Sequence, residues 1–314
     1  MPRIIKPARL RPGEVIGVVA PASPMKPELL EQGVRYLEGL GYRVKLGKFV
    51  YRENGYLAGS DRERSRDLNA MFRDRQVRAI ICVRGGYGTP RLLHLLDYDA
   101  IRDQPKIFVG YSDITALQLA IFRRTGLITF SGPMVAADMG RGIDPFTAAQ
   151  FWRMITEPVP CGDLEPQQDR PFAAITAGRV RGRLLGGCLS LVATVAGTAF
   201  MPAVQKSIFF LEEIGEEIYR IDRYLVHLRE LGVFAKIGGF VLGQMIDCEA
   251  KNGAPSLRLE DLMQDFIRPL RVPALMNLEY GHAGRKHTMP VGASAELLVS
   301  GRQRRLTVTE AAVV

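Results

Sequence analysis

The feature that most restricts the fold of this chain is the alternation of short apolar runs with amphipathic segments along its first half. Runs rich in Val and Ile predict buried strands, and apolar residues at helical spacing predict helices between them. The predicted strands are 15–20, 42–46, 79–83 and 107–109, and the predicted helices are 27–40, 62–72, 90–96 and 113–124. Because strands and helices alternate, we expect a parallel α/β sheet that binds ligands at the carboxyl ends of its strands.

The second half of the chain predicts a separate unit. A length of 314 residues exceeds the usual size of one domain. Residues 158–178 are rich in Pro and Gly, which predicts a linker between an N-terminal domain at 1–157 and a C-terminal domain at 179–314. In the second domain we expect strands at 207–211, 239–244, 295–299 and 305–309 and one long helix at 221–231.

Composition narrows the partners and the compartment. The net charge of +9 raises the question of nucleic acid, but basic residues alternate with acids, as in 61–67, so we expect an anionic small substrate and no nucleic acid. The four cysteines form no C-x-x-C pair and the histidines no H-E-x-x-H motif, so neither a metal nor another cofactor is expected. No apolar run has membrane-spanning length and the N-terminus lacks the pattern of a signal peptide, which predicts a cytoplasmic protein with no membrane partner.

The segment Gly110-Tyr-Ser-Asp-Ile-Thr115 is the first candidate for chemistry. It joins the predicted strand 107–109 to a predicted helix, and this strand–turn–helix arrangement is that of a nucleophile elbow, which would lift the Ser112 hydroxyl out of the sheet. The match is partial, because the pattern is G-x-S-D and not G-x-S-x-G. An alternative is that Ser112 only caps the helix N-terminus, a position that serine favours.

A glycine-rich loop, Arg84-Gly-Gly-Tyr-Gly88, follows the predicted strand 79–83. Its backbone N–H groups are not shielded by side chains, which suits an oxyanion hole formed by the N–H groups of Gly86 and Asp113. The spacing matches neither G-x-G-x-x-G nor the Walker motif, so the loop is not predicted to bind phosphate. A turn that merely connects strand and helix is the alternative.

A carboxylate and a general base can be chosen only provisionally from their positions. Glu212 ends an apolar strand, where a side chain has little freedom, and His282 lies in a glycine-flanked loop, which favours general-base chemistry over packing. The weaker candidates are Glu216, Glu217, Asp222 and Glu279 among the acids, and His287, His94 and His227 among the histidines.

Taken together, these segments resemble the LD-carboxypeptidase family of serine peptidases, the murein tetrapeptide carboxypeptidases. The resemblance spans nearly the whole chain and keeps the order of the family's motifs. The segments that carry it are Arg84-Gly-Gly-Tyr-Gly88 with Arg91-Leu-Leu, Gly110-Tyr-Ser-Asp-Ile-Thr115, Thr129-Phe-Ser-Gly-Pro-Met134, Gly186-Gly187, Leu211-Glu212-Glu213, Tyr219-Arg-Ile-Asp-Arg223 and Gly281-His282.

The resemblance implies a Ser–Glu–His triad formed by Ser112, Glu212 and His282. It implies an N-terminal α/β domain that carries the serine, a smaller C-terminal α/β domain that carries the other two residues, an active site between them, and a homodimer. The implied reaction removes a C-terminal D-amino acid from an L-centre; the usual substrate is a cytoplasmic muropeptide tetrapeptide that loses D-Ala in peptidoglycan recycling. Arginine suits recognition of the free carboxylate; the candidates are Arg84, Arg220 and Arg223.

Two other functions remain as alternatives. Related self-immunity peptidases cleave peptidyl-nucleotide antibiotics of the microcin C type and use an aromatic loop to stack the adenine. In this chain the segment after Glu212 is short and contains Tyr219 but no tryptophan, while Trp152 precedes the predicted linker, which favours the muropeptide substrate. A non-catalytic ligand-binding protein on the same scaffold would not need Ser112, Glu212 and His282 together.

Overall fold

The N-terminal part of the chain forms a six-stranded sheet. The computed structural model describes residues 3–250 and 255–314. The strand order is β12-β5-β4-β3-β1-β2, and neighbours are parallel except for β12, which runs antiparallel to β5. The bounds are β1 Val15–Val19, β2 Arg43–Leu46, β3 Val77–Cys82, β4 Ile107–Val109, β5 Thr129–Ser131 and β12 Met289–Val291. The predicted parallel α/β sheet is therefore confirmed, with one antiparallel edge strand from the far end of the chain.

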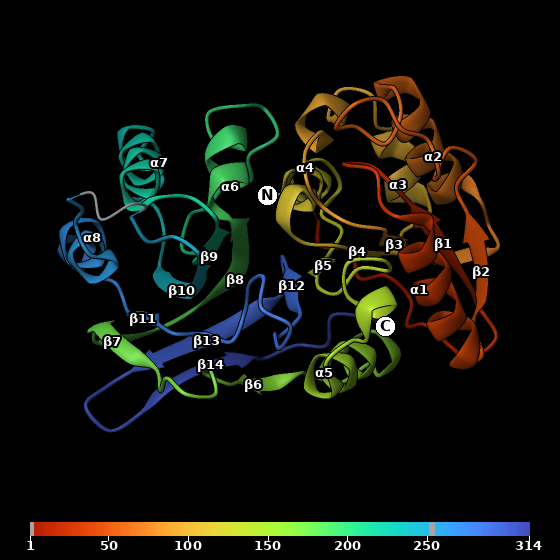
Figure 1. The fold of residues 1–314 in the computed structure, drawn as a ribbon. Coiled ribbons are helices and arrows are strands. Elements are labelled where there is room, and N and C mark those ends of the chain that lie inside the picture. The colour runs from red at the N-terminus through yellow and green to blue at the C-terminus, as the bar shows by residue number, and fades with distance from the viewer. Residues whose placement is uncertain (1–2, 251–254) are drawn as a thin grey trace.

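Helices cover both faces of this sheet, as Figure 1 shows on its right side. They are α1 Pro27–Gly39, α2 Asp61–Arg73, α3 Tyr98–Asp103, α4 Thr115–Thr125 and α5 Pro145–Thr156. Local sequence explains their ends: Ser60 and Glu63 form a reciprocal capping box at the start of α2, and Gly126, with φ of 80°, ends α4 in the left-handed conformation.

The second sheet has eight strands in the order β6-β14-β13-β8-β9-β10-β11-β7. Strands β8 to β11 are parallel to one another, and the outer strands are antiparallel. The bounds are β6 Gly162–Leu164, β7 Ala173–Thr176, β8 Gly178–Cys188, β9 Ile208–Ile214, β10 Gly239–Ile246, β11 Ala274–Met276, β13 Ser294–Val299 and β14 Arg304–Val308. The accompanying helices are α6 Leu189–Val195, α7 Ile218–Glu230 and α8 Leu259–Phe266.

Two expectations about local structure differ from what is observed. Residues 158–178 supply β6 and β7 to the second sheet, because their prolines and glycines separate short edge strands instead of marking an unstructured connection. The single helix predicted at 90–96 is wrong: a 3₁₀ turn, Thr89–Leu92, is followed by turns, and α3 begins separately at Tyr98. The side chain of Asp97 accepts the N–H of Ala100 and so starts this new helix.

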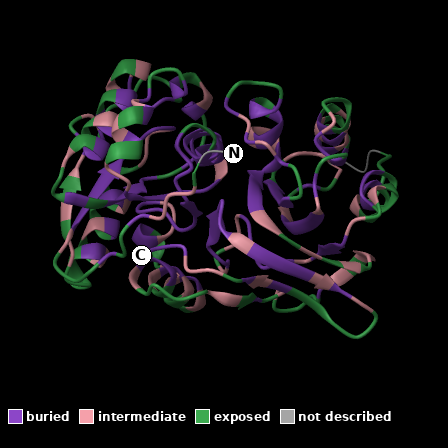
Figure 2. Cartoon of the chain, turned by 180° about the vertical axis from the view of Figure 1, so that it is seen from behind, coloured by how far each residue is buried: buried purple, intermediate pink, exposed green. Residues whose placement is uncertain are grey.

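The two halves of the molecule pack through α4. This helix is buried on almost every side because one side faces the first sheet and the other meets α6 and β8. At its first turn the Thr115 Oγ1 accepts the N–H of Cys188, and a Cβ on Gly187 would lie 2.6 Å from the Thr115 side chain, so only glycine permits this approach. Figure 1 shows α4 facing α6 and β12 lying between the halves, and Figure 2 shows the central strands of both sheets as largely buried.

The described parts of the chain contain neither a helix that could span a membrane nor a cluster of metal-binding side chains. No helix in residues 3–250 and 255–314 has the length and apolar character needed to cross a membrane. Within the same ranges, no three or more His, Cys, Asp or Glu side chains are grouped so that they could hold a metal ion. All four cysteines are free thiols.

Candidate active site

Ser112 occupies the turn between β4 and α4 with a strained backbone. Its φ is +63°, a conformation that non-glycine residues rarely adopt and that the sharp turn of a nucleophile elbow requires. Neither the 3₁₀ turn Ser112–Ile114 nor α4 has a side-chain cap, so the alternative that Ser112 merely caps the helix is wrong. The strain instead presents the hydroxyl beside the carboxyl ends of β3 and β4.

The glycine-rich loop after β3 lies directly against this serine. A Cβ on Gly85 would come within 2.8 Å of the Ser112 Cβ and 3.0 Å of its Oγ. Gly86 has φ of +115°, and a Cβ there would lie 2.3 Å from the Oγ of Ser23. Glycine is therefore required at both positions, and a Cβ on Gly85 would also lie 3.4 Å from the backbone nitrogen of Asp113, so the loop packs against the turn that carries Ser112.

The side chain of Asp113 holds the glycine loop in place. It is 1% exposed, its Oδ2 accepts the N–H of Thr89 at 2.8 Å, and the Thr89 hydroxyl donates to the Asp113 carbonyl oxygen. Burial raises the pKa of the Asp113 carboxyl, and the bond from Thr89 opposes this rise. The residue that follows the serine therefore fixes the relative position of the two expected oxyanion donors, Gly86 and Asp113.

We predict that Gly85→Ala lowers kcat by about 100-fold while the protein stays folded. The new methyl group would lie too close to the Ser112 side chain, so Ser112 must move away from its present position. The measurement is steady-state hydrolysis together with thermal unfolding. Gly39→Ala is the matched control, since a Cβ at Gly39 meets no atom within 4 Å. An active Gly85→Ala enzyme would contradict the proposed tight fit between the loop and the serine.

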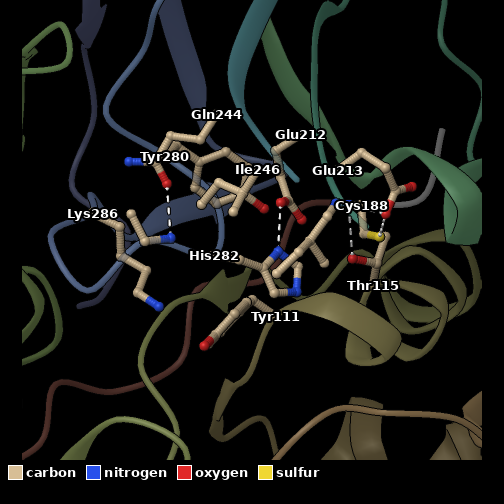
Figure 3. Close-up of polar contacts among 12 residues, drawn as sticks. Tyr111, Thr115, Cys188, Glu212, Glu213, Gln244, Ile246, Tyr280, His282 and Lys286 are labelled. Atoms are coloured by element: carbon tan, nitrogen blue, oxygen red, sulfur yellow. Dashed lines mark hydrogen bonds and ion pairs between the residues drawn. The ribbon is translucent and has the colours of Figure 1, made fainter. Parts of the chain in front are cut away.

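Glu212 and His282 form a buried acid–imidazole pair. Glu212 lies near the carboxyl end of β9 with a fully buried side chain, and its Oε2 is 2.7 Å from Nδ1 of His282 (Figure 3). A neutral imidazole that donates from Nδ1 to this carboxylate leaves Nε2 free to accept a proton. This is the geometry that a general base and its orienting acid require.

The loop that carries His282 is held close to β10. Gly281 has φ of +150°, and a Cβ there would lie 2.9 Å from the side chain of Gln244. The N–H of Ala283 donates to Oε1 of Gln244 at 3.0 Å. On the other side, the ring of Tyr111 lies edge-to-face against the imidazole with centroids 5.1 Å apart. The imidazole is therefore restrained by Glu212, by the loop and by an aromatic ring, as Figure 3 shows.

Ser112 and His282 line the same pocket of about 460 Å³. The pocket also contains Gly85 and Gly86 and three cationic side chains, and none of the described residues that line it is Asp or Glu. The cationic residues are Lys26, Arg84 and Arg141. This lining favours an anionic ligand.

The rival residues lie elsewhere. His287 is buried, accepts the N–H of Glu165 on Nε2 and packs against Phe146; burial and the nearby Arg285 lower its pKa to about 4. Glu279 is bound by Gln244 and Arg285. The remaining rivals also lie outside the residues that line the pocket: His94 and His227, and Glu216, Glu217 and Asp222.

The predicted substrate-binding arginines separate into two places. Arg84 lines the pocket, and its Nη1 donates to the carbonyl oxygen of Pro24 at 3.3 Å. Arg220 and Arg223 lie on α7 beside the ring of Tyr219, outside the residues that line the pocket, and Arg220 also pairs with Glu216.

Sequence reasoning missed four residues around the pocket: Tyr111, Asp138, Arg141 and Lys286. Tyr111 could have been identified from the sequence, because it directly precedes the candidate serine. Asp138 and Lys286 lie in loops and Arg141 ends a short 3₁₀ turn, and in such segments the sequence gives no periodic signal for a side chain's position.

An elbow serine that shares one pocket with a carboxylate-bound imidazole is the arrangement expected of a hydrolase. Comparison with known proteins identifies its family. Two family models match the chain, the LD-carboxypeptidase N-terminal domain at residues 16–132 and the LD-carboxypeptidase C-terminal domain at 181–297. The chain belongs to the LD-carboxypeptidase family, and is a peptidase.

Individual relatives cover nearly the whole chain. A probable murein peptide carboxypeptidase of Bacillus subtilis is 39% identical over 293 residues, which are 93% of this chain and 91% of the relative. The crystal structure of a muramoyltetrapeptide carboxypeptidase from Oxalobacter formigenes has 31% identity and a TM-score of 0.82, with 94% of this chain and 99% of that chain covered. The microcin C7 self-immunity protein MccF of Escherichia coli is 28% identical over 335 residues, covering 96% of this chain and 95% of the relative.

Proposed function

We propose that this protein is a serine-type LD-carboxypeptidase that releases the C-terminal D-Ala from muropeptide tetrapeptides during peptidoglycan recycling. The observation that carries the proposal is that the elbow serine Ser112 and the Glu212-bound imidazole of His282 line one cationic pocket. The names of the relatives from Bacillus subtilis and Oxalobacter formigenes support the substrate class. The proposed location is the cytoplasm and the proposed assembly a homodimer, as the family resemblance implies.

In the proposed mechanism, Nε2 of His282 accepts the proton of Ser112 as the hydroxyl oxygen attacks the carbonyl carbon before the terminal residue. Glu212 orients the ring and stabilises the imidazolium that forms. The N–H groups of Gly86 and Asp113 stabilise the oxyanion of the tetrahedral intermediate. The imidazolium then protonates the leaving amine of D-Ala, and a water molecule activated by His282 hydrolyses the acyl-enzyme.

We propose that Arg84 binds the free carboxylate of the terminal residue, because among the three predicted arginines it is the one that lines the pocket. Arg84→Ala should raise KM by about 10- to 100-fold with a smaller change in kcat, since a charge-assisted hydrogen bond to the substrate is lost. Arg62→Ala is the control, because this exposed arginine lies on α2 outside the pocket. If KM rises in Arg220→Ala or Arg223→Ala and not in Arg84→Ala, the carboxylate is bound at α7 instead.

The experiment that tests the proposed function is a comparison of peptides. We expect L-Ala-γ-D-Glu-meso-diaminopimelate-D-Ala to lose one residue, and the same peptide ending in L-Ala to remain intact. A folded protein that cleaves neither peptide but cleaves a peptidyl-adenylate would support the antibiotic-immunity alternative. A protein that binds the tetrapeptide without cleaving it would support the ligand-binding alternative.

The aromatic residues considered for adenine stacking do not favour the immunity alternative. Trp152 packs in the N-terminal half, where its ring stacks on Tyr42 and its Nε1 donates to the hydroxyl of Tyr36. Tyr219 is exposed on α7 and lies outside the residues that line the Ser112 pocket. Neither ring contributes to that pocket, so the muropeptide substrate is the better supported of the two.

A further inference from the structure

Lys286 is a buried lysine four residues after His282. Its side chain is only 2% exposed, which lysine tolerates when its charge is paired. Its Nζ lies 2.8 Å from Oδ1 of Asp138, whose side chain is 9% exposed, and 3.9 Å from the centroid of the Tyr111 ring. A buried ion pair is costly to form, so its position next to the candidate base suggests a functional role.

The ion pair joins the two halves of the molecule at the His282 loop. Lys286 belongs to the segment after β11, whereas Asp138 lies in the loop after β5, where its Oδ2 accepts the N–H of Met134 at 2.8 Å. A second connection lies beside it: the Thr147 hydroxyl of α5 accepts the N–H of Lys286 and donates to the carbonyl oxygen of Gly284. The loop that carries the base is thus bound at several points to the domain that carries the serine.

Tyr111 connects the pair to the imidazole. Its ring lies beneath the Lys286 ammonium and meets His282 edge-to-face, and its hydroxyl donates to Oδ1 of Asp138 at 3.4 Å. Tyr111 immediately precedes Ser112, so one residue contacts the buried ion pair and the His282 imidazole and is joined by the backbone to the candidate nucleophile. Figure 3 shows Lys286 extending to the side of Tyr111, with His282 above the ring.

We propose that Lys286 and Asp138 are a positioning pair, which fixes the His282 loop against Tyr111 and keeps the charge beside the imidazole balanced. The inference rests on the proposed role of His282 as general base. With both partners present, the ammonium and the carboxylate offset each other. Removal of the ammonium leaves an anion near His282 and stabilises the imidazolium, whereas removal of the carboxylate charge leaves a cation and destabilises it.

The other charged and titratable groups around His282 do not replace this pair. Among the described residues, Glu212 binds the imidazole directly, and none of the others forms an ion pair with Lys286 or Asp138. These groups are Glu213 beside Glu212 on β9, Glu279 and Arg285 near the loop, and Lys26, Arg84 and Arg141 in the pocket. Substitution of either partner therefore changes one charge and leaves this background constant.

The test is an NMR titration of the His282 imidazole in the free full-length protein, in which only four histidines must be assigned. Lys286→Met should raise the pKa of His282 by about 0.5 to 1.5 relative to the wild type, and Asp138→Asn should lower it by a similar amount. In a plot of kcat/KM against pH, the acidic limb should move to higher pH in Lys286→Met and to lower pH in Asp138→Asn. Lys45→Met is the control, because it removes the ion pair between the exposed Lys45 of β2 and Asp74 at the end of α2 and should leave the titration unchanged.

The double variant Lys286→Met/Asp138→Asn keeps the test decisive if a single variant does not fold, because it leaves no unpaired charge. In it the pKa of His282 should return close to the wild-type value, while kcat stays about 10- to 100-fold low because the loop has lost its attachment. Wild-type kcat in the double variant would overturn the proposal, and so would a folded single variant in which the pKa of His282 equals that of the wild type. Opposite pKa shifts in a protein that cleaves no tetrapeptide would support the pair and contradict the proposed function instead.

Discussion

Ser112→Ala should lower kcat for tetrapeptide hydrolysis by about 10⁴- to 10⁶-fold. The substitution removes the nucleophile and no other group of the proposed mechanism. It leaves the Glu212–His282 pair in place, and the hydroxyl forms no cap for the following helix, so the fold should be preserved. Residual activity would come from binding and from the oxyanion donors.

The measurement is single-turnover and steady-state hydrolysis, with circular dichroism and thermal unfolding to show that the variant is folded. Ser23→Ala is the matched control. The Ser23 hydroxyl accepts the N–H of Tyr87 in the glycine-rich loop but has no role in the proposed chemistry, so its removal should lower kcat far less than Ser112→Ala does. Near-wild-type turnover by Ser112→Ala would remove Ser112 from the mechanism and leave its strained backbone unexplained.

Glu212→Gln should lower kcat by about 10³- to 10⁴-fold with little change in KM. The amide has nearly the same shape as the carboxylate, so a fully buried side chain can be replaced without a cavity. It cannot stabilise the imidazolium, and an amide N–H directed at Nδ1 would favour the wrong tautomer of His282. The effect should therefore appear in the chemical step.

The adjacent residue provides a direct control. Glu213 is also buried, but its Oε2 accepts the N–H of Ser190 and its Oε1 lies 3.3 Å from the Cys188 sulfur (Figure 3). Glu213→Gln removes a carboxylate from the same strand and should lower kcat by less than about tenfold, since Glu213 has no role in the proposed mechanism and the amide oxygen can still accept the N–H of Ser190. Only the bonds that Oε1 accepts from Ile214 and Cys188 are lost. Equal losses in the two variants would mean that Glu212 acts through the stability of β9 and not through His282.

The serine turn and its loop could be predicted because their signals are local. A strand followed by Gly110, one residue and Ser112 restricts the backbone within six residues, and α4 ends at Gly126 as its position suggests. The boundaries of most strands in the first half follow in the same way from apolar runs. The prediction for the segment 158–178 was incomplete, because Pro and Gly accompany short edge strands as well as linkers. This segment contains the edge strands β6 and β7 in addition to turns.

Long-range contacts could not be predicted from one sequence. Lys286 and Asp138 are 148 residues apart, and nothing near either position indicates the other. The pairing of β12 with β5 likewise brings a late segment to the first sheet. For the same reason, the sequence offered three arginines for the carboxylate, and the structure separates Arg84 from the two on α7.

The measurement that tests the central claim most directly is mass spectrometry of L-Ala-γ-D-Glu-meso-diaminopimelate-D-Ala after incubation with the wild-type protein and with Ser112→Ala in parallel. We predict that the wild type removes one D-Ala to leave the tripeptide, and that the variant leaves the tetrapeptide intact over the same period. Equal release of D-Ala by both proteins would contradict the role of Ser112, and an intact tetrapeptide with a folded wild-type protein would contradict the proposed reaction itself.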